Sequence, residues 1–254
     1  MKYLFSTLLI ILFGSCSTKN QLVYLQDSNK NNISKLDHFQ FKNSIKPGDI
    51  LKIDVLTIIP EAALPYNKKI NQISSQNIDE LILDGYLVDD SSMINFPILG
   101  KISVNGLSEN DIEAKMKSLL LEGNHLTNPT VKVKRLNSKF TVLGEVQNAG
   151  TFTYYDQKLN IFQALGYAGD LLITAKRKNI KLIRHDNGLR KTYIFSLNNG
   201  EIFDKPFYYI KSNDVIIVEP NFNKIKSAGF IGSPSSIASI SSILLSITLL
   251  IINN

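Results

Sequence analysis

The chain has 254 residues, with 28 Lys and Arg against 22 Asp and Glu, so its formal net charge is +6. This small excess is dispersed, and no basic tract with interleaved aromatic residues occurs, so nucleic acid is not expected as a partner. The single cysteine, Cys16, excludes a disulfide framework and a thiolate metal site.

The first residues predict a secretion signal over 1–15. Leu4 to Phe13 form an apolar core that is too short to span a membrane, and Gly14-Ser15 are small. Because FGSC followed by STKN looks like a bacterial lipobox, in which the cysteine is cut to position one and carries lipid, we predict lipidation at Cys16. An ordinary signal peptide with a stray thiol is the alternative.

Residues 16–44 are polar and rich in asparagine, the composition of a tether, with LVYLQD as their only apolar patch. In IKPGDILKIDV, residues 45–55, the Pro-Gly pair predicts a turn and the alternation after it predicts a strand. IKSNDVIIVEP, residues 210–220, repeats this pattern with Asn213 at the glycine position. Asn and Gly both tolerate positive φ, so we expect one shared turn shape.

Residues 85–120 predict two short strands around Asp89-Asp90-Ser91-Ser92, a turn at Asn105-Gly106 and then a helix. Ser108 and Asp111 stand at capping-box spacing, and apolar residues follow at helical intervals. The adjacent carboxylates of Asp89 and Asp90 could suggest acid–base work or calcium. Adjacent residues in such a turn usually point to opposite sides and face water, so we favour a structural role.

Residues 139–154 predict a strand, a break at Asn148-Ala149-Gly150 and a second strand. LNIFQALGYAGDL has a helical pattern ended by glycines, and residues 179–197 predict two strands around Asp186-Asn187-Gly188, the strongest hairpin signal in the chain. Two strands, a helix and more strands in a segment of this length describe a small β-grasp module.

Motifs of catalysis or metal binding are missing. His38, His125 and His185 are far apart, and no Gly-x-Ser-x-Gly, Walker loop or Gly-x-Gly-x-x-Gly occurs, so we expect no catalytic residue, metal or cofactor. The pairs Tyr154-Tyr155 and Tyr208-Tyr209 could stack on sugars. The alternative is that alternating strands bury one member of each pair and expose the other.

SSIASISSILLSITLLII, residues 235–252, carries no charge and would span about 27 Å as a helix, close to the hydrocarbon thickness of a bilayer. We predict a membrane helix here, after a linker over 221–234. At 100° per residue a hydroxyl stripe forms. The stripe consists of Ser235, Ser239, Ser242 and Ser246. It could face water inside a ring of helices, let helices pack closely in lipid, or bond back to its own helix in a lone anchor.

IKPGDILKIDV followed by VDDSSMINFPILGKISVNGLSENDIEAKM resembles the periplasmic export domain of Wza-type polysaccharide export lipoproteins. FTVLGEVQNAGTFTY with ALGYAGDL is similar to the soluble-ligand-binding β-grasp (SLBB) module that follows that domain. The resemblance predicts an α+β chain, with an export domain over 45–137, one SLBB-like β-grasp module over 138–220, and a single C-terminal membrane helix. Longer relatives carry a second β-grasp copy, for which this chain has no room.

The resemblance implies a homo-oligomeric ring, lipid-anchored to the outer membrane with its body in the periplasm, whose C-terminal helices form a pore for capsular or exopolysaccharide. It implies transport without catalysis. The implied partners are the polysaccharide, further copies of the chain, membrane lipid and an inner-membrane polysaccharide co-polymerase, either a chain-length regulator or a tyrosine autokinase.

Because Cys16 would already supply an anchor, we favour a pore-lining or helix-packing role for the serine stripe. The competing interpretation is a membrane-tethered periplasmic adaptor, which binds glycan or links an inner-membrane synthase to another pore. A glycan-acting enzyme would need a carboxylate pair in a recognisable site, which the sequence lacks.

Overall fold

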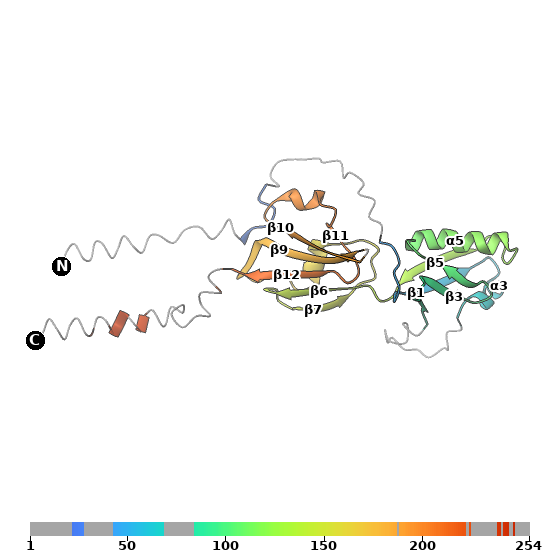
Figure 1. Cartoon of the computed structure of the whole chain (residues 1–254), viewed down its shortest axis with the longest axis horizontal. Helices are drawn as coiled ribbons and strands as arrows, with labels where there is room; N and C mark the ends of the chain where they lie inside the picture. The colour runs from blue at the N-terminus through green and yellow to red at the C-terminus, as the bar shows by residue number, and fades with distance from the viewer. Residues whose placement is uncertain are drawn as a thin grey trace, which may run out of the picture.

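The computed structural model describes residues 22–27, 43–68, 84–186 and 188–221, together with residues 224, 238, 239, 241–243 and 246. They form mixed α+β structure with several sheets and few helices. Two hydrophobic cores are present, one built from residues between Ile45 and Val133 and the other from residues between Phe140 and Val218. We call the parts around them the first module (43–135) and the second module (138–221), and they lie end to end in Figure 1.

The first module contains β1 (Ile50–Leu56), α3 (Pro60–Ala63), the 3-10 helix η1 (Leu64–Tyr66), β2 (Tyr86–Leu87), β3 (Met93–Phe96), β4 (Gly100–Ser103), α5 (Glu109–Glu122) and β5 (Thr130–Arg135). β1 is the centre of a three-stranded antiparallel sheet in the order β2-β1-β5. Leu51, Ile53 and Val55 of β1 are buried, so the predicted strand and its inward face are confirmed. β3 and β4 form a separate hairpin.

Helix α5 begins at the predicted capping box, which is confirmed. The Ser108 hydroxyl accepts a hydrogen bond from the Asp111 N–H at 3.3 Å, and the Asp111 carboxylate accepts one from the Ser108 N–H at 2.9 Å. Ile112, Met116 and Leu120 are fully buried against the sheet. The helix therefore has one apolar face, as its residue spacing predicts.

Helix α5 also covers the free edge of β5. Glu113 accepts a hydrogen bond from the Val133 N–H at 2.9 Å, and Glu109 accepts one from the Arg135 N–H at 3.0 Å. These carboxylates satisfy edge N–H groups that could otherwise pair with a strand of another chain.

The second module contains β6 (Lys139–Gly144), β7 (Gly150–Thr153), β8 (Leu159–Asn160), α6 (Ile161–Tyr167), β9 (Ala175–Asp186), β10 (Leu189–Phe195), the 3-10 helix η2 (Gly200–Asp204), β11 (Tyr209–Ile210) and β12 (Val215–Pro220). Its main sheet has the order β10-β9-β12-β6-β7, and only the β12–β6 pair within it is parallel. The predicted hairpin is confirmed, because Leu189 pairs with Asp186 across the turn.

Glycine is required at the end of β6, where Gly144 pairs with Val218 of β12. Gly144 has φ +96°, and a Cβ atom there would lie 2.0 Å from the Val218 carbonyl oxygen. A larger residue would push β6 and β12 apart at the centre of the sheet.

The structure shows how the tyrosine pairs and the acidic turn are placed. Tyr154 is 1% exposed whereas Tyr155 is 48% exposed, so the predicted alternation is confirmed for this pair. Tyr208 and Tyr209 are both half-buried, so the predicted alternation is wrong for this pair. The Asp89 carboxylate accepts hydrogen bonds from the Ser91 and Met93 N–H groups of its own turn, which confirms the structural interpretation.

Within the described part of the chain, no helix is both long and apolar enough to cross a membrane. Most of residues 235–252 lie outside that part, as do the predicted signal (1–15), Cys16 and nearly all of the linker. The membrane helix and the signal therefore stay predictions.

Candidate functional site

Two turns of the same construction lie at the starts of β1 and β12. In each, a lysine N–H donates a hydrogen bond to an aspartate three residues later, Lys46 to Asp49 at 2.8 Å and Lys211 to Asp214 at 2.8 Å. The residue before each aspartate has positive φ, +84° at Gly48 and +68° at Asn213. The shared turn shape predicted from the sequence is confirmed.

Each turn aspartate is buried against an arginine that the sequence did not single out. Asp49 lies 3.4 Å from Arg135, and Asp214 accepts hydrogen bonds from the Arg184 Nε at 2.9 Å and Nη2 at 2.7 Å. Burial raises the pKa of both carboxyls, and the arginines oppose that shift. Such pairs hold the turns in place, because removing either partner would leave an uncompensated buried charge.

The two turns present their lysine side chains to one carboxylate. The Lys46 Nζ lies 3.6 Å from Asp186, and the Lys211 Nζ lies 3.4 Å from it. Lys46 also donates to the His185 carbonyl oxygen at 3.2 Å. Partial burial opposes ionisation of Asp186, but the ammonium groups of Lys211 and Lys46 outweigh it and hold its pKa below the usual value. A lysine of the first module thereby bridges to the β9–β10 hairpin of the second.

Beside this bridge, a cleft of about 690 Å³ lies between the two modules. The first module contributes residues 43–47, Ser92 and Asn105-Gly106, and the second contributes Lys211 and the residues around His185. Its size is that of a small-molecule site. Its walls offer amides, hydroxyls, ammonium groups and one carboxylate, which suit reversible hydrogen bonding to a polar ligand.

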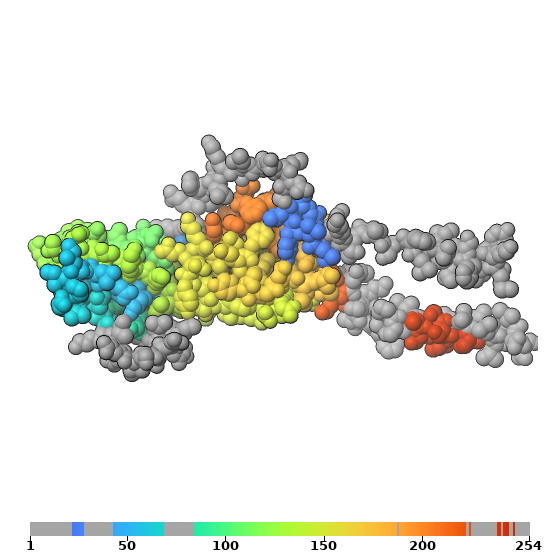
Figure 2. Space-filling model, turned by 180° about the vertical axis from the view of Figure 1, so that it is seen from behind, coloured from blue at the N-terminus to red at the C-terminus, as the bar shows by residue number. Residues whose placement is uncertain are grey.

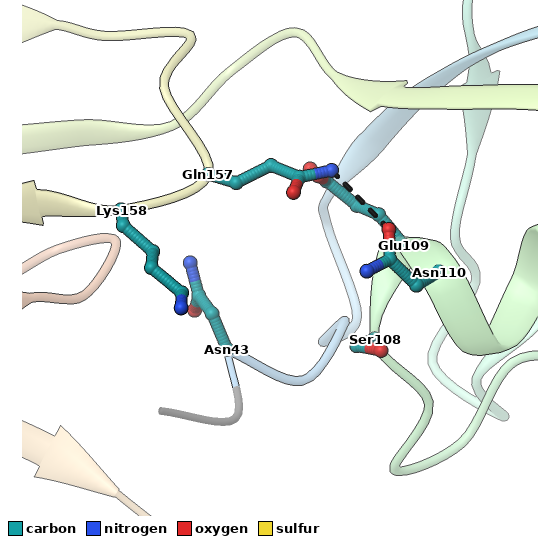
Figure 3. Close-up of a pocket in the computed structure, with 6 residues that line it drawn as sticks. All are labelled: Asn43, Ser108, Glu109, Asn110, Gln157 and Lys158. Atoms are coloured by element: carbon teal, nitrogen blue, oxygen red, sulfur yellow. Dashed lines mark hydrogen bonds between the residues drawn. The ribbon is translucent and has the colours of Figure 1, made fainter. Parts of the chain in front are cut away.

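A smaller cavity of about 100 Å³ lies at the same boundary (Figure 3). Gln157 of the second module donates a hydrogen bond to the Asn110 side chain at the start of α5, at 3.4 Å. Lys158 lies opposite Asn43, a residue that lines both cavities. The two cavities that Asn43 lines are therefore both bordered by polar side chains from the two modules.

Tyr154 and Arg135 form the buried part of this boundary. The Arg135 guanidinium donates to the Asn43 carbonyl oxygen at 3.0 Å. Burial raises the pKa of Tyr154 to about 12, although the nearby Arg135 charge opposes the shift, so the phenol stays neutral at physiological pH. The sequence signals for this region were the repeated turn of IKPGD and IKSND and the Tyr154-Tyr155 pair, and neither identified the arginines or the place of Tyr154 at the boundary.

None of the predicted site residues that the structure describes lines this cleft. Ser239, Ser242 and Ser246 are described and exposed, whereas Ser235 and Cys16 lie outside the described residues. The Ser242 hydroxyl donates to the Ala238 carbonyl oxygen at 2.8 Å, and the Ser246 hydroxyl donates to the Ile243 carbonyl oxygen at 2.8 Å. The role of the stripe and the lipidation of Cys16 stay predictions.

No group of three His, Cys, Asp or Glu side chains among the described residues could hold a metal ion. His125 packs edge-on against Tyr66 in the first module, with ring centroids 5.9 Å apart, and His185 belongs to β9 in the second. His38 lies outside the described residues. The two described histidines therefore lie in different modules.

Comparison with known proteins identifies the first module. No curated protein matches the chain. Residues 41–135 match the family of polysaccharide biosynthesis/export proteins, a range that begins just before the first turn and ends with β5. This is a transport family rather than an enzyme family. Residues 41–135 are therefore a polysaccharide biosynthesis/export domain, consistent with a Wza-type export protein, and the function of the chain is related to polysaccharide export.

Proposed function

We propose that this chain is a subunit of an outer-membrane polysaccharide export channel. Copies assemble into a homo-oligomeric ring that conducts capsular or exopolysaccharide from the periplasm to the cell surface. The observation that carries this proposal is the export domain at residues 41–135. Lipid on Cys16 anchors the chain, its body lies in the periplasm, and an inner-membrane co-polymerase delivers the polymer.

In this proposal, residues 45–137 are the export domain and residues 138–220 are an SLBB-like β-grasp module. The strand order of the second module supports the β-grasp assignment. Its first and last strands, β6 and β12, lie parallel at the centre of the sheet. β7 pairs with β6 on one side, and the β9–β10 hairpin pairs with β12 on the other. Helix α6 follows the first hairpin and buries Ile161, Ala164 and Leu165 in the core.

Ring formation is tested by the size of the full chain in mild detergent. Electron microscopy of the extracted particle should show rings, and membrane fractionation should place them in the outer membrane. Replacing Cys16 with Ser should abolish labelled fatty-acid incorporation. A monodisperse monomer over a wide concentration range would contradict the proposal of a channel and favour the periplasmic adaptor.

Conduction is tested on the serine stripe. Replacing Ser239 and Ser242 together with Leu should impair export, because two bulky side chains would narrow a hydroxyl-lined passage or force packed helices apart. The matched control replaces Ile240 and Leu244 with Val and should export normally, since that face stays apolar. The measurement is surface polysaccharide at equal protein level.

A second candidate is the membrane-tethered periplasmic adaptor. The hydroxyls of Ser242 and Ser246 bond to carbonyls of their own helix, which is the pattern expected of a lone anchor and favours this candidate. An adaptor predicts that the Ser239/Ser242 double leucine variant exports normally, because Leu is more favourable in lipid than Ser.

A further inference from the structure

The segment before the first module docks on the second module. In residues 22–27, the Leu25 N–H donates to the Leu197 carbonyl oxygen at 3.0 Å and the Gln26 N–H donates to the Asn198 carbonyl oxygen at 2.7 Å. Figure 2 shows these residues in blue on the surface of the second module, toward its end away from the first. LVYLQD, the one apolar patch of the predicted tether, is therefore part of the folded body.

Tyr24 connects residues 22–27 to the loop that contains Asp170. Its hydroxyl donates to the Asp170 carboxylate at 2.6 Å, and the Arg177 guanidinium lies over its ring, 5.4 Å from the centroid. Burial raises the pKa of Tyr24 to about 12, and the Asp170 hydrogen bond adds to the shift, so the phenol keeps its proton at neutral pH. The incoming chain is thus held at Asp170 and Arg177.

The outgoing chain leaves the sheet at the same place. After β12, the Asn221 N–H donates to the Thr174 carbonyl oxygen at 2.7 Å, and the Lys224 Nζ lies 3.5 Å from Glu145. Figure 1 shows the blue residues 22–27 and the end of β12 at one end of the second module, opposite the first module. Both ends of the folded body therefore meet segment 170–178.

Segment 170–178 exposes an apolar side chain among basic ones. Ile173 is 70% exposed, and Lys176 and Lys178 beyond it are exposed as well. Glu219 lies 3.7 Å from Lys176 and also pairs with Lys181, and Glu145 pairs with Lys224. Five basic side chains at this end, Lys176, Arg177, Lys178, Lys181 and Lys224, thus exceed by one the carboxylates of Asp27, Glu145, Asp170 and Glu219, which leaves a small positive excess.

We propose that segment 170–178 contacts an anionic lipid surface, with Ile173 entering the boundary between headgroups and acyl chains and Lys176 and Lys178 facing lipid phosphates. This inference rests in part on the proposed lipid at Cys16. Five residues lie between Cys16 and Leu22, so the docked segment begins within about 22 Å of the lipidated residue even if the chain is fully extended. An apolar tip with basic neighbours is the chemistry that interfacial contacts use.

The chain contains no tryptophan, so Ile173→Trp creates a single fluorescent reporter. The full chain carrying it is reconstituted into vesicles of phosphatidylethanolamine and phosphatidylglycerol whose acyl chains are brominated. We expect the tryptophan emission of this Ile173→Trp variant to be blue-shifted relative to that of the protein in detergent-free buffer without vesicles. We also expect its intensity to be at least twofold lower in brominated than in unbrominated vesicles. The matched control is Ile58→Trp in the first module, where Ile58 is 82% exposed and far along the chain from the segment, and its emission should be unchanged.

The role of the lysine charges is tested by adding Lys176→Gln and Lys178→Gln to the Ile173→Trp variant, which should reduce the quenching. Replacing the anionic vesicles by vesicles of phosphatidylcholine alone should reduce it as well. Equal quenching of Trp at positions 173 and 58, or none at 173, would overturn the proposal. Fatty-acid labelling of Cys16 is measured on the same protein. If Cys16 is labelled and rings form while position 173 stays unquenched, the lipid contact alone fails and the export function stands.

Discussion

At the scale of single residues, the Arg184–Asp214 pair is the most deeply buried charge contact described. Asp214→Asn leaves the Arg184 guanidinium buried without its counter-charge, so we expect the free energy of unfolding to fall by about 3–5 kcal/mol. Urea unfolding of the full chain in mild detergent measures this. Asp90→Asn, at an exposed turn position, should change stability by less than about 0.5 kcal/mol. Equal stability of the two variants would contradict a structural role for the pair.

The positive φ angles of the two turns make a second residue-scale prediction. Asn213→Gly should change stability little, because glycine adopts φ +68° without strain. Gly48→Ala should cost about 1–2 kcal/mol although no atom lies within 4 Å of the new Cβ, because an alanine is strained at φ +84°. Thermal unfolding of both variants decides between backbone strain and crowding. A larger loss for Asn213→Gly would refute the shared-turn account.

At the scale of elements, the capping box of α5 should contribute measurably to stability. Ser108→Ala removes the acceptor for the Asp111 N–H, and we expect a loss of about 1 kcal/mol. Ser118→Ala in the same helix is the control, because the Ser118 hydroxyl bonds only to the exposed Glu122 side chain among the contacts described. Hydrogen exchange of the first turn of α5 should rise in the first variant alone. Unchanged protection there would contradict the capping role.

Elements with local signals could be predicted from the sequence, and elements made by distant pairing could not. The capping box, the Asp-Asn-Gly hairpin and the alternation of β1 depend on neighbouring residues, which the sequence displays. The parallel pairing of β6 with β12 joins residues more than seventy positions apart, as in Val215 with Thr141. The glutamates of α5 that cover β5 likewise depend on a helix–sheet contact that residue spacing does not encode.

The candidate site shows the same division. The two Lys-x-x-Asp turns could be predicted because each turn is local, but their convergence on Asp186 could not, since it requires the β9–β10 hairpin to reach the first module. Neither could the docking of residues 22–27, because the composition of LVYLQD within a polar stretch does not distinguish a tether from a docked segment. Burial and charge pairing decide these features, and both arise only on folding.

At the scale of the whole molecule, the first and second modules are joined mainly by polar contacts. Lys46 bridges to Asp186, and Gln157 bridges to Asn110, across a boundary that holds the 690 Å³ cleft. Partly exposed ion pairs contribute little stability, typically less than about 1 kcal/mol, and are weakened by salt. The angle between the modules should therefore respond to pH and ionic strength although each core remains intact.

Asp186 sets the direction of the pH response. Its pKa in the folded chain lies below the unfolded value of about 3.9 because of Lys211 and Lys46, so its contribution to stability is present above about pH 4 and is lost as pH falls through the folded value. We expect the distribution of distances between the modules to broaden as pH is lowered below about 4. Spin labels at Glu61→Cys and Lys178→Cys, in a chain with Cys16→Ser, measure this distance.

The variant Asp186→Asn isolates the bridge from general acid effects. At neutral pH it should broaden the distance distribution as acid does in the parent chain, because Lys46 loses its charged partner in the second module and keeps only the His185 carbonyl oxygen there, while the buried Arg135–Asp49 and Arg184–Asp214 pairs stay in place. It should also remove most of the acid-dependent change. Asp54→Asn, whose carboxylate contacts Lys52 within the first module, should leave the distance unaltered. If parent and Asp186→Asn chains have the same distance at neutral pH and the same acid profile, the bridge does not set the angle between the modules.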